Sequence, residues 1–274
     1  MTFSPKYDFI VGIDSDGTVF DSMTIKHNLA FLPAFFETWN VEDYRKIVEA
    51  NWEFVNLTSR DRGCNRFIGL LKAFENLEKN GAKPYDYSDL TAFVQNSKAL
   101  SNKGLLEYIG ADTEGFLGSV YKWSLRCDEL FEVHNEGQPP FKNVLEALKL
   151  MSAKADIAVI SSASYGSIAK DWTDNGLMAY VSIACGQESG SKIKQLKDTA
   201  GGYKKNHVLM MGDAPGDQEA AVANGALFFP VIPKRETECW ELLINEAFEK
   251  FMNGSYAGDY EKKLVEEFER ALGV

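Results

Sequence analysis

Two hydrophobic patterns divide this chain of 274 residues. Between about residues 20 and 135, apolar side chains recur at helical spacing and convincing strand signals are absent. After the glycine and two prolines of 137–141, short apolar runs alternate with amphipathic segments. The segment 8–14 is also a short apolar run that ends in polar residues, as a fully covered strand does. The pattern therefore predicts a helical block that interrupts an α/β domain after its first strand.

The elements follow from these periodicities. In the helical block, the spacing of apolar residues predicts helices over 24–39, 64–81 and 112–134. In the second part, β-rich apolar runs predict strands over 156–162, 179–185, 207–213 and 226–232. Amphipathic segments predict helices over 141–153, 165–176, 191–202, 217–225 and within 234–272.

Strands and helices that alternate strictly, with short connections, predict a parallel sheet covered by helices on both faces. We therefore expect an α/β fold with a Rossmann-like core of residues 1–20 and 137–274. An all-helical domain of residues 21–136 is inserted into it.

Composition narrows the class of protein. The 45% apolar and 25% charged residues are ordinary for a soluble globular chain, and no apolar stretch approaches the roughly 18 residues of a membrane span. A net charge of −11 without a long basic run argues against a nucleic-acid partner. The N-terminal segment lacks a signal-peptide pattern, so we expect a cytoplasmic protein with no membrane partner. The oligomeric state is left open.

The four cysteines are widely spaced and form no C-x-x-C pair. This spacing argues against a zinc site or a disulfide framework, and we expect ordinary thiols.

Polar side chains follow four of the predicted strands. In open α/β sheets the binding crevice lies beyond the carboxyl ends of the strands, so these residues are expected to meet at one edge. They are Asp14 and Asp16, Ser161 and Ser162, Lys192, and Asp213 and Asp217.

Each of these features has an ordinary interpretation when taken alone. A D-x-D at a strand end is often a turn, and serines after a strand often cap the next helix. Lys192 alone would be a solvated residue at a helix start. Together, however, several carboxylates at one edge need a proton or a cation between them. Oxygen ligands without histidine or cysteine favour Mg²⁺, which leaves positions for water and a substrate phosphate.

The segments DSDGTVFDS (14–22), VIS (159–161), GSK (190–192) and GDAPGD (212–217) stand in this order along the chain. This set resembles the haloacid dehalogenase-like superfamily of Mg²⁺-dependent phosphotransferases. The first segment is similar to the family's D-x-D-G-[TV] motif and the last to its G-D-x-x-x-D motif. The two middle segments are too short to be specific alone. The resemblance covers residues 9–22 and about 140–230.

The resemblance implies a role for each matching residue. Asp14 would be the nucleophile that carries a transient aspartyl-phosphate, and Asp16 the general acid and base. Mg²⁺ would be held by the Asp14 carboxylate, the Asp16 backbone carbonyl, Asp213 and, through water, Asp217. Ser161 at a helix N-terminus would bind the phosphoryl group, with Ser162 as the alternative register. Lys192 would neutralise that group.

The helical block stands where this family inserts a cap that supplies substrate contacts. Arg60, Arg62 and Arg66 are three arginines within seven residues of an acidic chain. They are either a solvated loop or ligands for a charged substrate group. Lys26 and His27 are weaker candidates for the same role. Two aromatic clusters at helical spacing are expected to form the cap core: Phe31, Phe35, Phe36 and Trp39, and Tyr121, Trp123 and Phe131.

The expected function is Mg²⁺-dependent hydrolysis of a small phosphorylated metabolite, a phosphate monoester, through an aspartyl-phosphate. A sugar-phosphate mutase would use the same residues and return the phosphoryl group to the substrate. A phosphonate hydrolase would need a cap lysine that we do not identify. A binding or regulatory protein could retain the fold without the chemistry, but it would have no need of all four residues Asp14, Asp16, Lys192 and Asp213.

Overall fold

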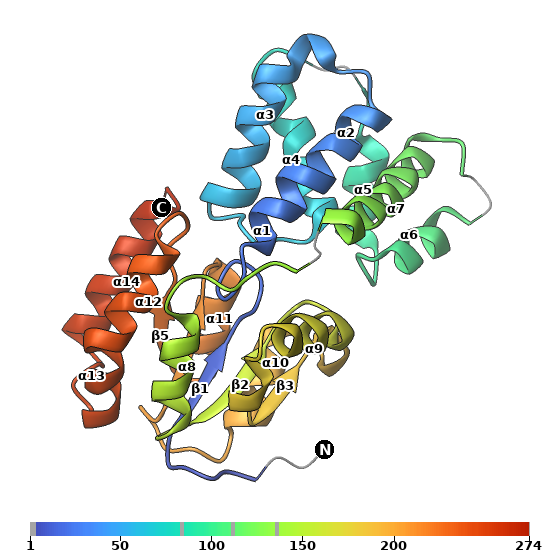
Figure 1. Ribbon diagram of the computed structural model, residues 1–274. Helices are drawn as coiled ribbons and strands as arrows, with labels where there is room; N and C mark the ends of the chain where they lie inside the picture. Colours follow the sequence, from blue (N-terminus) through green and yellow to red (C-terminus); the bar gives the residue numbers. More distant parts are fainter. Residues whose placement is uncertain (1–3, 83–84, 111–112, 135–136, 274) are drawn as a thin grey trace. The chain divides into compact units, whose positions relative to one another are not determined.

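The computed structural model describes residues 4–82, 85–110, 113–134 and 137–273 (Figure 1). The chain forms two compact units, one of Met1–Ser22 with Gly137–Val274 and one of Met23–Glu136. The first division falls after Ser22, whereas the sequence placed it after residue 20. The first residue of the helix predicted over 112–134, and residue 136 at the second predicted boundary, lie outside the described residues.

The first unit is built on a sheet of five parallel strands in the order β3-β2-β1-β4-β5. The strands are β1 (Ile10–Ile13), β2 (Asp156–Ile160), β3 (Ile183–Cys185), β4 (Val208–Gly212) and β5 (Leu227–Pro230). All residues of β1, β2, β4 and β5 are buried, as their continuous apolar runs predict. The strand from the N-terminal segment thus lies in the centre, between β2 and β4.

Helices cover this sheet from both faces, since right-handed crossovers place α8 and α9 on one face and α10 and α11 on the other. In agreement with this, α10 packs against α11, and α8 packs against the π-helical segment Leu243–Ala247. The helices are α8 (Val144–Ser152), α9 (Tyr165–Asp174), α10 (Lys192–Ala200), α11 (Pro215–Ala223), α12 (Glu236–Leu242), α13 (Phe248–Asn253) and α14 (Asp259–Ala271). The predicted α/β class is confirmed.

One strand is much shorter than predicted. The segment 179–185 was expected to be extended, but Met178–Tyr180 forms a 3₁₀ turn and β3 begins at Ile183. The cause is local: the Tyr180 N–H donates to the Leu177 carbonyl, and pairing with β2 begins only where the Ser182 N–H reaches Ile157.

In the described residues of the second unit, all regular elements are helical and turns connect them. Its elements are α1 (Ser22–Ile25), a π-helical segment (Lys26–Phe31), α2 (Leu32–Thr38), a 3₁₀ turn (Glu42–Tyr44), α3 (Arg45–Glu53), a second π-helical segment (Phe54–Thr58), α4 (Arg66–Lys79), α5 (Ser88–Asn96), α6 (Asn102–Ile109) and α7 (Phe116–His134). Periodicity predicted the helices at both ends and α4, but not α3, α5 or α6.

This helical unit has its own aromatic core. Phe31, Phe35, Trp39 and Trp123 are buried, and Phe36, Tyr121 and Phe131 pack against them half-buried. The two aromatic clusters of the sequence are therefore core, as expected, and not a ligand box. Within the described ranges, none of the helices has both the length and the hydropathy that a bilayer span requires.

Candidate functional site

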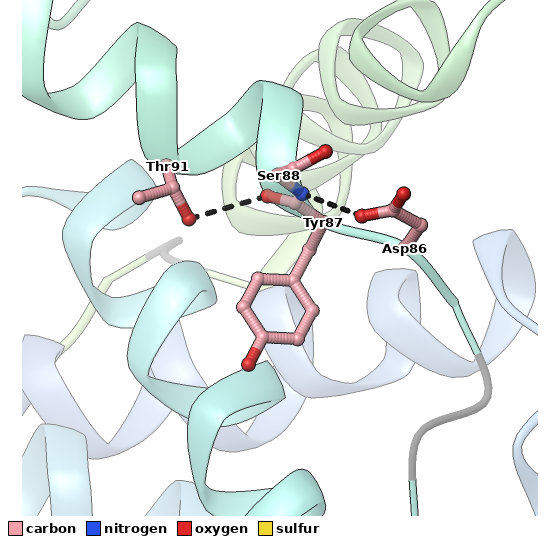
Figure 2. Close-up of a pocket in the computed structure, with 4 residues that line it drawn as sticks. All are labelled: Asp86, Tyr87, Ser88 and Thr91. Carbon is pink, nitrogen blue, oxygen red and sulfur yellow. Dashed lines mark hydrogen bonds between the residues drawn. The ribbon is translucent and has the colours of Figure 1, made fainter.

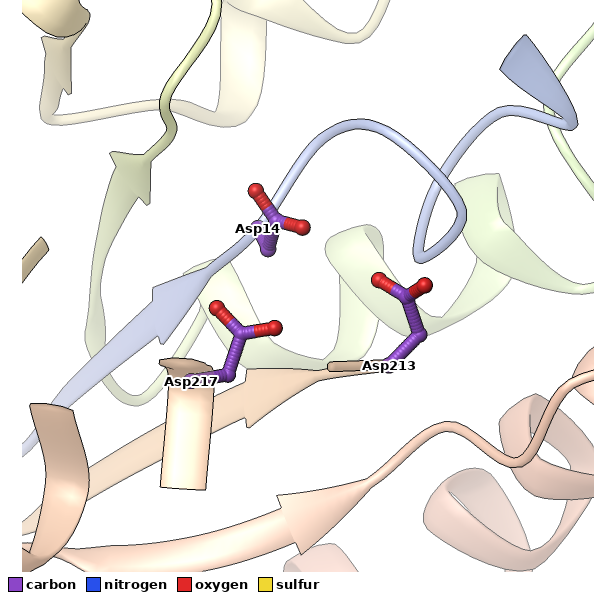
Figure 3. Close-up of side chains that lie close together, drawn as sticks. All are labelled: Asp14, Asp213 and Asp217. Carbon is purple, nitrogen blue, oxygen red and sulfur yellow. The ribbon is translucent and has the colours of Figure 1, made fainter. Parts of the chain in front are cut away.

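Three aspartates meet at the carboxyl end of the sheet in the first unit. Asp14 follows β1, Asp213 follows β4, and Asp217 lies in the first turn of α11 (Figure 3). One carboxylate oxygen of each lies within 4.8 Å of one oxygen of the other two. The three side chains are buried, with residue exposures of 3%, 1% and 0%. The arrangement follows from topology, because β1 and β4 are neighbours and the Asp14 N–H donates to the Met211 carbonyl.

Close approach of Asp217 depends on Gly212 at the end of β4. A Cβ at this position would lie 2.2 Å from the Asp217 carboxyl carbon. Asp217 Oδ2 also accepts a hydrogen bond of 3.1 Å from the Ala214 N–H, so it caps α11 while its other oxygen faces the cluster.

Lys192 joins the cluster from the first position of α10. Its Nζ lies 2.9 Å from Asp14 Oδ1 and 2.7 Å from Asp217 Oδ1. Burial raises the pKa of Asp14 well above its ordinary range, while the Lys192 ammonium acts in the opposite direction. For Lys192 itself, burial alone would lower the pKa, but Asp14 and Asp217 raise it. The lysine therefore stays charged beside both carboxylates.

The charges of this group fit a divalent cation. Three carboxylates and one ammonium carry an excess of negative charge when all are ionised. Burying such an excess is costly unless a cation compensates it. Every ligand atom offered is a hard carboxylate oxygen, which suits Mg²⁺ better than zinc or copper.

Asp16 lies outside the carboxylate cluster. Its Oδ1 accepts a short hydrogen bond of 2.6 Å from the Ser22 hydroxyl, and the residue is half-buried. Between Asp16 and Ser22 the chain turns tightly at Gly17, whose φ of 81° favours glycine. The Trp240 indole N–H donates to the Thr18 carbonyl, so the loop after β1 is anchored to the sheet's helical cover.

Ser161 is buried directly after β2, whereas Ser162 is exposed. The Ser161 N–H donates to the Cys185 carbonyl and to Gln195 Oε1, and its Oγ accepts from the Ala163 N–H. One part of the prediction is wrong: Ser161 does not stand at a helix N-terminus. Helix α9 begins at Tyr165, and Ser164 is the residue that caps it. The preference for Ser161 over Ser162 as phosphate ligand stays a prediction.

Two supporting residues were missed by the sequence analysis. Thr18 Oγ1 donates to Asp213 Oδ1 at 2.8 Å. Thr18 lies inside the first motif, and this position was the signal available for it. Gln195, almost fully buried, donates to the carbonyls of Ser161, Gly186 and Gly190. Gln195 follows Lys192 by three residues on α10, and residues three apart lie on the same face of a helix. This spacing could have indicated that Gln195 lies on the same side of α10 as Lys192.

The three arginines of the helical unit differ from one another. Arg60 is exposed, whereas Arg62 is buried and its Nη1 donates to the Leu57 carbonyl at 2.8 Å. Arg66 bonds the Ser124 carbonyl and pairs with Asp128 at 2.7 Å. The solvated-loop interpretation is therefore wrong for Arg62.

Lys26 and His27 open the first π-helical segment of the same unit. The Lys26 ammonium lies 5.1 Å from the centre of the Phe131 ring. His27 is buried, and its pKa falls to about 3 because of burial and then because of neighbouring positive charges. The imidazole is thus neutral at physiological pH. The residue has a packed position rather than a surface one.

A small pocket in the helical unit holds none of the predicted site residues. It has a volume of about 270 Å³ and is lined by Asp86, Tyr87, Ser88 and Thr91 at the start of α5 (Figure 2). The Ser88 N–H donates to Asp86 Oδ1 and the Thr91 hydroxyl to the Tyr87 carbonyl. These polar groups satisfy one another in a local turn, so the pocket is not the candidate site.

A scan against protein-family models matches residues 70–231 to the haloacid dehalogenase-like hydrolase family. The matched segment begins within α4 and ends just after β5. It includes Ser161, Lys192, Asp213 and Asp217, while Asp14 precedes it. A search of curated proteins found no match.

Solved structures share the fold at low sequence identity. A predicted phosphoglycolate phosphatase from Haemophilus somnus 129pt is 14% identical, with a TM-score of 0.51 over 85% of this chain and 92% of that chain. A putative phosphoglycolate phosphatase from Lactobacillus delbrueckii subsp. bulgaricus is 15% identical, with a TM-score of 0.50 over 81% and 85%. A defluorinating L-2-haloacid dehalogenase is 17% identical, with a TM-score of 0.43 over 83% and 82%.

Proposed function

Because the chain belongs to the haloacid dehalogenase-like hydrolase family, we propose that it is a Mg²⁺-dependent phosphatase acting on a small phosphate monoester. The observation that carries the proposal is the position of Asp14. Its carboxylate stands at the end of the central strand, 2.9 Å from the Lys192 ammonium and beside Asp213 and Asp217. A nucleophilic carboxylate in such a site can approach a phosphate whose charge is neutralised there.

Each step has a residue to perform it. An Asp14 oxygen attacks phosphorus, the bond from phosphorus to the ester oxygen breaks, and Asp16 gives its proton to the departing alkoxide. Water then attacks phosphorus and gives a proton to Asp16, and the bond from phosphorus to Asp14 breaks. The products are an alcohol and inorganic phosphate, and both carboxyl groups return to their starting forms.

The cation would be held by the carboxylates of Asp14 and Asp213 and the backbone carbonyl of Asp16 and, through water, by Asp217. When bound, it offsets the negative charge of the transferring phosphoryl group. Lys192 adds a fixed positive charge to the same place, and Ser161 supplies a hydroxyl for a phosphoryl oxygen.

Asp16 supports a phosphatase over a dehalogenase. A departing alkoxide needs a proton, whereas a halide leaves as a stable anion and needs none. The Asp16 carboxyl accepts a hydrogen bond from the Ser22 hydroxyl and is not one of the three carboxylates of the cluster, so we assign the proton transfer to it. We expect the substrate to be a small phosphorylated metabolite, with no nucleic-acid or membrane partner; the cytoplasmic location also stays a prediction.

A phosphate-release screen with Mg²⁺ over sugar phosphates, nucleotides and phospho-acids tests the proposal. On the best substrate, Asp14→Asn should lower kcat by about 10⁴-fold or more, because it removes the nucleophile. Asp21→Asn is the matched control, since Asp21 is exposed in the same motif and has no proposed role. If both variants turn over at the wild-type rate, Asp14 is not the nucleophile.

Asp16→Asn separates the acid role from the nucleophile role. The variant should lose its rate on alkyl phosphates yet still release p-nitrophenol in a single turnover, since that leaving group needs no proton.

A sugar-phosphate mutase would behave differently from a phosphatase. It would convert one sugar phosphate to its isomer and release no inorganic phosphate, which sugar analysis beside the phosphate assay detects.

A further inference from the structure

The α/β unit contains a second cavity, separate from the candidate site. Its volume is about 610 Å³. Small-molecule sites usually have about 300 to 1,000 Å³. The cavity is lined by residues of α10, of the loop that follows it, of the start of β4 and of the end of α11, all within one unit. Of the residues that the structure describes along its walls, none belongs to the aspartate cluster or to the expected phosphate ligands.

The walls of this cavity are largely apolar. Ile193 and Leu196 line it from α10, Val208 from the start of β4 and Ala223 from α11. Asn224 Nδ2 donates to the Ile193 carbonyl at 3.1 Å, which ties the end of α11 to α10. The large aliphatic side chain of Ile193 is nevertheless 42% exposed. Covering such a side chain with an apolar group is favourable, so the walls fit an apolar part of a ligand.

Three lysines line the same cavity: Lys197, Lys204 and Lys205. Their side chains are exposed, and in the described part of the chain none of them has an ion-pair partner and no acidic side chain lines the cavity. Lys194 on the same helix differs from them, because it pairs with Asp198. In a protein with a net charge of −11, three lysines without carboxylates form a local positive field that attracts an anion.

The end of helix α10 accounts for only one of these lysines. Lys197 lies in the last turn of α10, where a cation compensates the partial negative charge of the helix C-terminus. Lys204 and Lys205 lie beyond Gly201, which follows the last residue of the helix, and the effect of a helix end falls off within one turn. Their position at the cavity therefore has another explanation.

The loop that carries two of the lysines is held in place by hydrogen bonds. The Tyr203 hydroxyl donates to Asp156 Oδ2 at 2.8 Å, and Asp156 is only 1% exposed. At the end of the loop, the His207 N–H donates to the Lys204 carbonyl at 3.0 Å. A loop that is fixed before a ligand binds loses less conformational freedom on binding. The charged side of the cavity is therefore organised in advance.

We propose that this cavity is a binding site for an organic anion that has an apolar body and a carboxylate or phosphate group. The aliphatic walls would cover the apolar body, and Lys197, Lys204 and Lys205 would pair with the anionic group. The site shares no residue with the aspartate cluster. It therefore does not depend on whether the protein is a phosphatase.

A pair of fluorescent probes tests binding to the whole protein in buffer with Mg²⁺. 8-Anilinonaphthalene-1-sulfonate and N-phenyl-1-naphthylamine share their rings and differ in one sulfonate, so the first is an anion and the second is neutral. Equilibrium dialysis measures the binding of each. We expect the anionic probe to bind saturably at one site per chain. Binding that does not saturate would mean that the cavity does not hold an organic anion.

Two pairs of adjacent, exposed lysines give a matched comparison. Lys204→Gln with Lys205→Gln should weaken binding of the anionic probe at least about fivefold, because two charge contacts are lost, and should leave binding of the neutral probe unchanged. Lys262→Gln with Lys263→Gln on α14 makes the same change in net charge outside the cavity and should affect neither probe. Lys204→Arg with Lys205→Arg retains the charge and should retain binding. Equal weakening by the two glutamine pairs would overturn the proposal.

Two neighbouring positions on α11 test the location. Ala223→Trp places a large side chain in the exposed wall of the cavity and should abolish saturable binding of the anionic probe. Val222→Trp is the control, since Val222 is 72% exposed and does not line the cavity. Equal binding by both variants would place the probe elsewhere. A wild-type dimer that excludes the probe and that Ala223→Trp dissociates would show a second copy of the chain in this place, and would also overturn the proposal.

Two competitors distinguish the possible anionic groups. 1-Naphthoate and 1-naphthyl phosphate share their rings and differ in the anion, and each is titrated against the bound probe in EDTA, where the proposed phosphatase lacks its metal ion. Displacement by either compound supports the site, and the tighter one identifies the group as a carboxylate or a phosphate. If neither displaces the probe, the cavity is not a site for such anions. A failed phosphate-release screen leaves these results standing, so the two proposals fail separately.

Discussion

The two units bury charge of opposite sign. At the sheet edge of the first, three carboxylates share one ammonium, Lys192. In the helical unit, a buried imidazole and an indole donor lie among cations, with Arg62 also buried. The first group has more negative than positive charge, and in the described part of the helical unit His27 Nδ1 and Trp52 Nε1 have no hydrogen-bond partner. The comparison teaches that buried polar atoms differ in meaning: the excess of carboxylates at the sheet edge indicates a cation as ligand, whereas the polar atoms of the helical unit belong to a packed aromatic core.

The two regions also differ in how the chain assembles them. Parallel strands bring their carboxyl ends to one edge, so residues far apart in sequence meet there by topology. In the helical unit no such rule operates, and His27 and Trp52 meet only because their helices pack around a shared aromatic core.

The largest expected effect comes from removing the Lys192 ammonium from the carboxylate cluster. In EDTA, Lys192→Met should lower the free energy of unfolding by about 3 to 5 kcal/mol, because it leaves buried carboxylates without their partner. Urea unfolding measures the change. Lys194→Met on the same helix is the control, since that side chain is 61% exposed and should contribute little. Equal losses for the two variants would show that charge balance does not stabilise the cluster.

Removal of the metal ion tests whether a bound cation also compensates the charge of the carboxylate cluster. At Mg²⁺ concentrations about 100 times its Kd, the wild-type protein should gain about 2.7 kcal/mol of unfolding free energy over protein in EDTA. Asp213→Asn should lose most of this gain, because it removes one ligand oxygen charge, while Asp21→Asn should retain it. A gain that survives in Asp213→Asn would place the cation elsewhere.

The helical unit should respond to pH through His27. The folded pKa of about 3 lies below the ordinary value of 6.5, so the unfolded chain takes up a proton first as the pH falls. Between pH 7 and pH 5 this should cost about 2 kcal/mol of unfolding free energy. His27→Gln should lack that part of the loss, whereas exposed His134→Gln should retain it. Urea unfolding at each pH gives the difference, and parallel curves for wild type and His27→Gln would contradict a buried neutral His27.

The smallest effects separate two arginines in one loop. Arg62→Met should lower the unfolding free energy by about 1.5 kcal/mol, since it removes a buried charged donor from the Leu57 carbonyl. Arg60→Met should change it by less than about 0.5 kcal/mol, because Arg60 is exposed. Thermal and urea unfolding of both variants, without added anions, measure the contrast. A larger loss of unfolding free energy for Arg60→Met than for Arg62→Met would contradict the buried position of Arg62.

Much of the α/β unit could be predicted from the sequence. Buried strands in a parallel sheet are continuous apolar runs, so four of the five strands were found close to their positions. The same rule brought Asp14 and Asp213 to one edge, where the structure has them. The fifth strand, β3, was predicted to begin too early, because a 3₁₀ turn at Met178–Tyr180 and an extended strand use similar apolar residues.

The helical unit was predicted less completely. Its helices α3, α5 and α6 are short, and a short amphipathic stretch forms a helix only through the packing of its neighbours. The side chain of Arg62 could not be placed at all. A long, flexible side chain lies in solvent or in the interior according to what surrounds it, and three closely spaced arginines look alike in sequence.

By itself, the sequence determined the type of architecture, the break between its two patterns and the residues that gather at the sheet edge. Those properties depend on periodicity and on the direction of strands, which local residues set. Only the tertiary structure decided that Lys192 contacts both Asp14 and Asp217, and that Gln195 holds the Ser161 loop. It also decided that, within the described ranges, His27 Nδ1 and Trp52 Nε1 are buried without a hydrogen-bond partner. Contacts of this kind depend on packing between distant segments, because burial and partners, not residue type, determine what a charged or polar side chain does.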